Sequence, residues 1–230
     1  MKKIIFYRFI FVFILINCSI ISYAQNTIFG HNFRNLAVVN GNNVNIYGYE
    51  NGWKRLTQMD FILPYGYKNV FGFNMGNLGV VINNKIRFYE FKENWNESSR
   101  IEFDLPYGYK SIFLFGFVNI ALIIDNKIKI FQATRGWKEA TEMEFVLPNG
   151  YKNVFQLIPY IGVIINDKIK FYGFNNKWEE IKTLEFNLPK NYNYVFGLSG
   201  YTLCVVFDNK VKIFHYDEEW EELTNLEFIY

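Results

Sequence analysis

Five tryptophans recur along this sequence, and an indole ring can bind a ligand by stacking. They are spaced by 42, 42, 41 and 42 residues, at Trp53, Trp95, Trp137, Trp178 and Trp220. An aromatic face can stack on the C–H face of a sugar ring or anchor a protein partner, and it can equally fill the space between two packed sheets. Each tryptophan follows a polar turn at the expected start of a strand, so both a ligand-binding and a structural role remain open.

A basic residue lies eight positions before four of these tryptophans. The set is Arg87, Lys129, Lys170 and Lys212, with Asn45 at the same place in the first repeat. If these side chains point into a groove between repeats, they form ligand-binding sites together with the tryptophans. The alternative is that they lie on a solvated face of each repeat and have no ligand.

Acidic residues recur seven positions after each tryptophan, at Asp60, Glu102, Glu144, Glu185 and Glu227. Folding two neighbouring strands onto each other brings Lys85 roughly opposite Glu102, and Lys127, Lys168 and Lys210 repeat the arrangement. Opposite charges that face each other across two strands stabilise a sheet. We therefore predict structural ion pairs here, with ligand-accepting carboxylates as the alternative.

The sequence gives little support to catalysis. The two histidines, His31 and His215, do not occupy equivalent positions. No His, Asp and Glu cluster has the spacing of a metal site, and neither a nucleophile elbow nor a phosphate-binding glycine loop occurs. A glycosidase needs two distinct carboxylates at one place, whereas these acids recur identically. We expect a protein that is not an enzyme and has no catalytic residues, metal ligands or cofactors.

All these residues belong to five repeats of about 42 residues. A Leu-Pro pair followed by a Tyr-rich turn marks four of the junctions, as in Leu105-Pro106-Tyr107-Gly108-Tyr109-Lys110. A fixed period of this length is typical of a solenoid, a propeller or an array. The predicted repeats span residues 26–66, 67–108, 109–150, 151–191 and 192–230.

Each repeat predicts four short strands. Asn83-Asn84 is a two-residue turn of the kind that type I′ hairpins use, and equivalent Asn/Asp pairs follow in the later repeats. The fourth strand shows alternating polarity and is expected to run unbroken until Pro106 ends it. In the second repeat the four strands are expected at residues 67–73, 78–82, 85–91 and 95–105.

Four antiparallel strands in a repeat of this length are the pattern of a propeller blade. The chain therefore resembles the β-propellers across residues 26–230, which implies an all-β, five-bladed β-propeller with four antiparallel strands per blade. In architecture it is similar to the tachylectin-type sugar-binding propellers, although no sugar-contacting motif matches. The predicted ring starts with a first strand and ends with a fourth, so it closes either by packing of the first blade on the last or with shifted blade boundaries.

The first 24 residues resemble a secretory signal peptide. Lys2 and Lys3 precede a run over residues 4–16 that is apolar except for Arg8, and Ser22-Tyr23-Ala24 places small residues at a cleavage site. We expect a secreted, periplasmic or cell-surface protein without a stable membrane span after cleavage. A lipoprotein anchored at Cys18 is the alternative.

The mature chain would carry 21 basic and 22 acidic residues, without a block of like charge. Nucleic acid is therefore not an expected partner. Cys204 would be the only cysteine left after cleavage, so no disulfide forms within the mature chain. Its apolar neighbours predict a buried side chain.

These observations favour a secreted, non-enzymatic binding module that binds carbohydrate, such as a surface glycan, through repeated sites between blades. The alternative is a protein-interaction or structural scaffold at the cell surface. Exposure distinguishes the two, because open clefts around the tryptophans favour the first and burial between blades favours the second.

Overall fold

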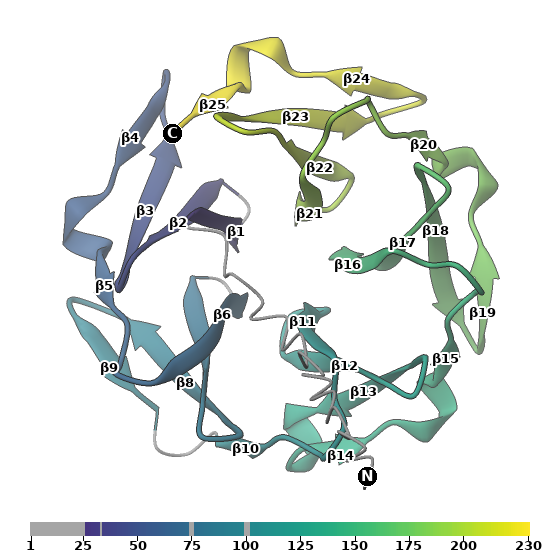
Figure 1. Cartoon of the computed structure of the whole chain (residues 1–230), viewed down its shortest axis with the longest axis horizontal. Coiled ribbons are helices and arrows are strands. Elements are labelled where there is room, and N and C mark those ends of the chain that lie inside the picture. Colours follow the sequence, from purple (N-terminus) through teal and green to yellow (C-terminus); the bar gives the residue numbers. More distant parts are fainter. Residues whose placement is uncertain (1–25, 33, 74–75, 99–101) are drawn as a thin grey trace, which may run out of the picture.

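The computed structural model describes residues 26–32, 34–73, 76–98 and 102–230. Five antiparallel sheets surround a central channel (Figure 1), and the regular elements of these residues are strands and short 3₁₀ helices. The chain is thus a five-bladed β-propeller, as the repeats predict. Aromatic and β-branched residues dominate it because they fit a pleated, half-buried surface.

Every blade starts at the channel and ends at the periphery. In the second blade the order outward is β6 (Tyr67–Phe73), β7 (Asn77–Ile82) and β8 (Lys85–Phe91), and both β9 (Trp95–Glu97) and β10 (Phe103–Asp104) pair with β8. The first blade has β1 (Asn26–Asn32), β2 (Asn35–Asn40), β3 (Asn43–Tyr49), β4 (Trp53–Arg55), η1 (Thr57–Met59) and β5 (Phe61–Ile62). The third has β11 (Ser111–Phe115), β12 (Asn119–Ile124), β13 (Lys127–Gln132), η2 (Ala133–Arg135), β14 (Lys138–Glu139), η3 (Thr141–Met143) and β15 (Phe145–Val146). The fourth has β16 (Asn153–Leu157), β17 (Tyr160–Ile165), β18 (Lys168–Asn175), β19 (Lys177–Glu180), η4 (Lys182–Leu184) and β20 (Phe186–Asn187). The fifth has β21 (Tyr194–Ser199), β22 (Thr202–Val206), β23 (Lys210–Tyr216), β24 (Trp220–Glu222), η5 (Thr224–Leu226) and β25 (Phe228–Ile229).

The prediction of an unbroken fourth strand is wrong. In the third blade the Ala140 amide still donates to Ile130 of β13, and the outer segment rejoins β13 where Phe145 faces Ile128. The outer segment uses five residues over a distance that β13 covers in two. The surplus residues coil into η3, so the two-residue alternation cannot continue across them.

The predicted hairpin turns between the second and third strands have type I′ geometry in three blades. Both residues of Asn83-Asn84 have positive φ, at 48° and 64°, as a type I′ turn requires. The pairs Asp125-Asn126 and Asn166-Asp167 have the same geometry. In the fifth blade the two-residue turn Asp208-Asn209 is also present, since Phe207 donates its amide hydrogen to the Lys210 carbonyl oxygen, but neither turn residue has the positive φ of a type I′ turn.

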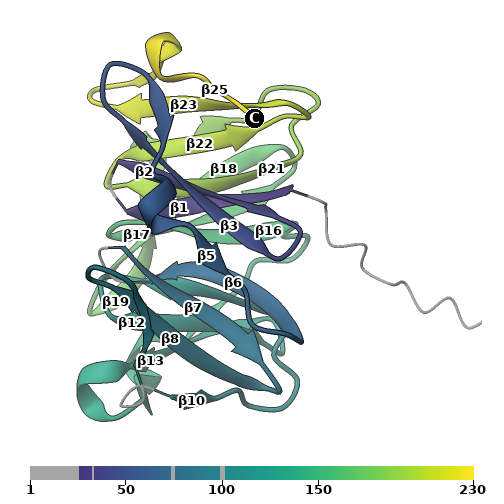
Figure 2. The same cartoon turned by 90° about the vertical axis from the view of Figure 1, so that its left-hand side faces the viewer.

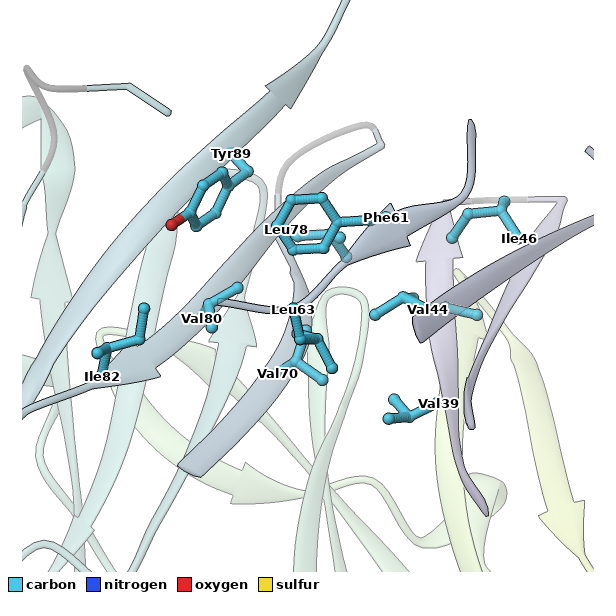
Figure 3. Packing of buried hydrophobic residues seen from close by; sticks show 11 residues of the cluster. Val39, Val44, Ile46, Phe61, Leu63, Val70, Leu78, Val80, Ile82 and Tyr89 are labelled. Carbon is cyan, nitrogen blue, oxygen red and sulfur yellow. The ribbon is translucent and has the colours of Figure 1, made fainter. Parts of the chain in front are cut away.

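The hydrophobic core lies between blades and is divided into five clusters. Figure 3 shows the first, in which Phe61 and Leu63 of the first blade meet Leu78 and Val80 of the second. Full burial of one such side chain contributes about 1.5–3 kcal/mol. The ring is therefore held together mainly by side-chain packing between blades.

Closure of the ring uses the same packing. Ile28 and Leu36 of the first blade share a buried cluster with Cys204 and Val206 of the fifth, and Figure 2 shows the two blades side by side. The Ile28 amide donates to the Tyr194 hydroxyl at 2.6 Å across this junction. The chain thus closes by packing of its first blade on its last. Cys204 is fully buried as expected, and burial raises the pKa of its thiol.

Candidate functional site

The five tryptophans lie in five separate blade interfaces, where each is half-buried. Four donate their indole N–H to a backbone carbonyl of the preceding blade, at the last residue of its peripheral 3₁₀ helix. The pairs are Trp53 with Leu226 (2.8 Å), Trp95 with Met59 (2.9 Å), Trp178 with Met143 (3.0 Å) and Trp220 with Leu184 (3.0 Å). The carbonyl that would match Trp137 belongs to residue 101, outside the described residues.

A phenylalanine in the last short strand of each blade meets the tryptophan of the next blade in every interface. The ring centroids are 5.2–5.4 Å apart in Phe61–Trp95, Phe103–Trp137, Phe145–Trp178, Phe186–Trp220 and Phe228–Trp53. In two interfaces a second ring stacks on the indole, with Phe88 on Trp137 and Phe171 on Trp220. The geometry of the tryptophans is that of inter-blade packing, and the structure does not gather them at one place.

The basic residues of the third strands lie beside glutamates of their own blades. The ion pairs are Arg87–Glu97 (3.5 Å), Lys129–Glu139 (3.0 Å), Lys170–Glu180 (3.0 Å) and Lys212–Glu222 (2.8 Å). In the first blade Asn45 instead accepts a hydrogen bond from Arg55 at 2.7 Å. These cations share a blade face with the tryptophans, and their charges are already compensated.

The predicted cross-strand pairs between lysines and the recurring acids are confirmed. They are Lys85–Glu102 (3.2 Å), Lys127–Glu144 (2.7 Å), Lys168–Glu185 (2.6 Å) and Lys210–Glu227 (2.9 Å). The hydrogen bond from Lys127 lowers the pKa of Glu144, and that from Lys168 lowers the pKa of Glu185. Both carboxylates are thereby held in the ionised form near pH 7 and are poor proton donors.

A cavity of about 160 Å³ lies in the central channel, between the innermost strands of the blades. A phenylalanine from the same position of each repeat contributes to its wall: Phe29, Phe71, Phe113, Phe155 and Phe196. Ile158, Ser199 and Phe117 show that the cavity reaches the end of the channel where the inner strands finish. We did not predict this site from the sequence, although the five-fold recurrence of phenylalanine was a usable signal.

Glycines control how closely the inner strands approach. A Cβ at Gly72 would overlap the carbonyl oxygen of Gly30, and one at Gly197 would overlap the carbonyl oxygen of Gln156. In these pairs the strand backbones touch, which only glycine permits. At the equivalent positions the third and fourth blades carry Leu114 and Gln156.

These two side chains hold β11 away from its neighbours, because a Cβ there cannot share the space that glycine leaves to a carbonyl. The contacts that β11 makes with β6 and β16 are accordingly sparser than those that β1 and β21 make around the ring. Leu114 and Phe117 line the cavity on this side, and the Gln156 amide of the fourth blade donates to the Gly116 carbonyl of the third at 3.2 Å. All five blades line the cavity, and the two breaks in the repeat pattern lie in its wall.

The wall of the cavity has one ionisable side chain among its described residues, His31. His31 is only 3% exposed and lies edge-on to Trp95, with ring centroids 6.0 Å apart. Burial lowers its pKa to about 4, and a smaller effect of the Gly76 backbone opposes this. Within the described part of the chain neither ring nitrogen meets a hydrogen-bond partner in good geometry. The wall is therefore uncharged near pH 7.

A group of tyrosines lies between the fourth and fifth blades, near the cavity-lining residues Ile158 and Ser199 in sequence. The hydroxyls of Tyr160 and Tyr201 are 3.3 Å apart, and this contact raises the pKa of Tyr160 to about 12. Tyr201 stacks on Tyr216 and is 40% exposed, with a positive φ of 59°. No other repeat carries this group.

Among the described residues, no three His, Cys, Asp or Glu side chains lie together in a way that suits a metal ion. The same residues contain no helix of the length and hydropathy that a membrane crossing needs. The expected signal peptide and Cys18 lie outside the described residues.

Neither a protein-family model nor a curated protein matches the sequence. Solved structures match the fold. The chain is 12% identical to Hsv2 from Kluyveromyces marxianus, with a TM-score of 0.50 over 84% of this chain and 78% of that one. It is 15% identical to Hsv2 from Kluyveromyces lactis, with a TM-score of 0.50 over 84% of this chain and 75% of that one. At this identity the similarity shows the propeller fold alone.

Proposed function

We propose that this chain is a non-enzymatic binding module of the cell exterior that holds part of its ligand in the mouth of the central channel. The observation that carries the proposal is the apolar cavity of about 160 Å³ in the central channel. It is lined by aromatic side chains with a few polar groups, which is the usual composition of a ligand site. The signal-like segment at residues 1–24 supports export.

A binding role suits this site better than a catalytic one. General acid–base catalysis needs a group whose pKa lies near the working pH, and the one ionisable group of the described wall, His31, is kept neutral with a pKa of about 4. The recurring glutamates are held in ion pairs of their own blades, as in Lys127–Glu144.

Carbohydrate binding between blades is the second candidate, and it remains a prediction. Its support is that half-exposed tryptophans recur in five equivalent interfaces, so five weak sites would act together on a repetitive glycan. Against it, four indole N–H groups are already used, as in the hydrogen bond from Trp178 to Met143. That geometry favours the alternative of a protein-interaction scaffold.

The test compares the ligands of matched variants. Residues 25–230 are screened against a displayed peptide library and a glycan array, with folding followed by circular dichroism. Leu114→Trp fills the channel mouth, Trp95→Ala opens one blade interface, and Tyr65→Ala alters a fully exposed residue as a control. A ligand that is lost in Leu114→Trp alone supports the channel mouth. A glycan that is lost only in Trp95→Ala supports the inter-blade site and rejects the channel as the ligand site.

A further inference from the structure

We infer that the channel mouth selects a neutral, flat ring about the size of benzene, an inference that rests on the binding function proposed for this cavity. The first argument is size. The cavity measures about 160 Å³. An apolar protein cavity of ~150 Å³ accepts a benzene molecule. The volume of the site therefore matches one six-membered ring.

The walls supply the geometry that such a ring prefers. Phe71 and Phe155 are buried, because each lies flat over a glycine of its own blade, Gly79 and Gly162. The other three blades have Ala37, Ala121 and Cys204 at that place, and there the rings of Phe29, Phe113 and Phe196 are only half-buried.

Three phenylalanine rings thus remain partly exposed around the cavity. Aromatic pairs favour edge-to-face or offset stacking, each contributing about 0.5–1.5 kcal/mol beyond the burial of area. A flat ring can make such contacts with several walls at once. A flexible alkyl chain of equal volume gains the burial without these oriented contacts.

The uncharged wall sets the second requirement. A carboxylate or ammonium group that entered the cavity would lose its water and meet no opposite charge, since His31 is neutral near pH 7. The half-buried side chains of Asn32, Gln156 and Ser199 are the neutral polar groups beside the rings. A single neutral substituent such as a hydroxyl is therefore accepted, and a charged one is not.

Such a ring can come from a free aromatic compound or from the Phe or Tyr side chain of a peptide. Fluorine NMR on residues 25–230 distinguishes them with four probes: fluorobenzene, 4-fluorophenol, 4-fluorobenzoate and a 4-fluorophenylalanine peptide blocked at both ends. We expect the first two to bind and the benzoate to bind roughly two orders of magnitude more weakly, because its charge is desolvated without a partner. Stronger binding of the peptide than of free fluorobenzene identifies a side chain as the natural occupant, and the reverse order identifies a free compound.

Two variants test whether the probes bind in the channel. Leu114→Trp fills the mouth and is expected to weaken fluorobenzene binding at least tenfold, while Tyr65→Ala leaves it unchanged. If the filled variant does not fold, Phe113→Leu removes one aromatic wall and is expected to weaken fluorobenzene more than cyclohexane.

The inference is overturned if no neutral ring binds the folded wild type at millimolar concentration, or if the benzoate binds as well as the phenol. If Leu114→Trp loses a library ligand but no ring probe binds the wild type, the channel mouth is still a binding site, and the inference that it selects an aromatic ring is wrong. If the ring probes bind but no library ligand depends on the channel mouth, the proposed function is wrong, and the inference about which rings the cavity accepts still stands.

Discussion

Lowering the pH from 7 to 5 should destabilise this propeller through one side chain. His31 is buried between the first and second blades, and burial lowers its pKa to about 4 from the ordinary value of 6.5. In the unfolded chain the imidazole gains a proton as the pH falls through 6.5, whereas in the folded chain it stays neutral until about pH 4. The unfolded state therefore binds more protons in this window, and the free energy of unfolding falls with pH.

The size of the effect follows from the two pKa values. Each pH unit between the pKa of the unfolded state and that of the folded state lowers the free energy of unfolding by about 1.4 kcal/mol. The change from pH 7 to pH 5 therefore removes about 2 kcal/mol. That amount is a sizeable part of the ~5–15 kcal/mol that stabilises an ordinary domain. The loss continues to about pH 4, below which both states are protonated.

The assay is urea unfolding at pH 7 and pH 5 for the wild type and His31→Leu. The other repeats carry Phe73, Phe115, Leu157 and Leu198 at this position, so an apolar side chain suits the site. The variant should lose about 2 kcal/mol less than the wild type over this pH interval.

His215→Gln is the matched control, because it removes the other histidine, which is half-buried and hydrogen-bonded to Thr202 at 3.1 Å. It should not reproduce the effect of His31→Leu. Equal losses for the wild type and His31→Leu between pH 7 and pH 5 would refute the argument, since the burial of a neutral imidazole would then have no thermodynamic consequence.

Three further predictions concern two blade interfaces and an ion pair within one blade. Trp178→Phe keeps most of the packing and removes the N–H that donates to the Met143 carbonyl, so the free energy of unfolding should fall by about 1–3 kcal/mol in urea titrations. Gly197→Ala forces a Cβ against a backbone carbonyl of the fourth blade and should lower the melting temperature, through a loss of about 1–3 kcal/mol. Glu144→Gln breaks a partly exposed ion pair with Lys127 and should change the free energy of unfolding only slightly, with a smaller effect still in 1 M salt.

Each of these has its own control. Trp178→Phe is compared with Phe174→Leu, which alters a ring beside the same indole without touching the hydrogen bond. Gly200→Ala has 3.3 Å to its nearest neighbour and should be milder than Gly197→Ala, and the opposite order would contradict the close approach of the strands. A loss of several kcal/mol in Glu144→Gln would show that the ion pairs hold the blade together.

Much of the fold could be predicted because its regularities are local. The 42-residue period, the Asn83-Asn84 turn and the pairing of Lys85 with Glu102 all follow from neighbours within one repeat. The break in the fourth strand could not be predicted, because it depends on how many residues the outer segment uses relative to β13. Two-residue alternation in a sequence looks the same whether or not the chain follows its partner strand.

The candidate site was missed for a different reason. The predicted site residues were those that recur with the tryptophans, and recurrence in a propeller chiefly reports the five equivalent interfaces. The Phe228–Trp53 contact shows this, since it closes the ring with the same geometry as the other four. The channel depends on contacts between the first strands of different blades, and no spacing within one repeat reveals them.

A repeat protein therefore separates two kinds of position. A residue present in all five blades, such as the tryptophan, makes the same packing contact in every blade interface, so its recurrence needs no ligand to explain it. A residue that departs from the pattern does not make that shared contact. Leu114 and Gln156 replace glycines that let neighbouring strands touch, and the cavity lies beside them. The Tyr160–Tyr201 pair also departs from the pattern. On this argument the departures are better guides to binding than the repeats, because only they distinguish one part of the ring from another.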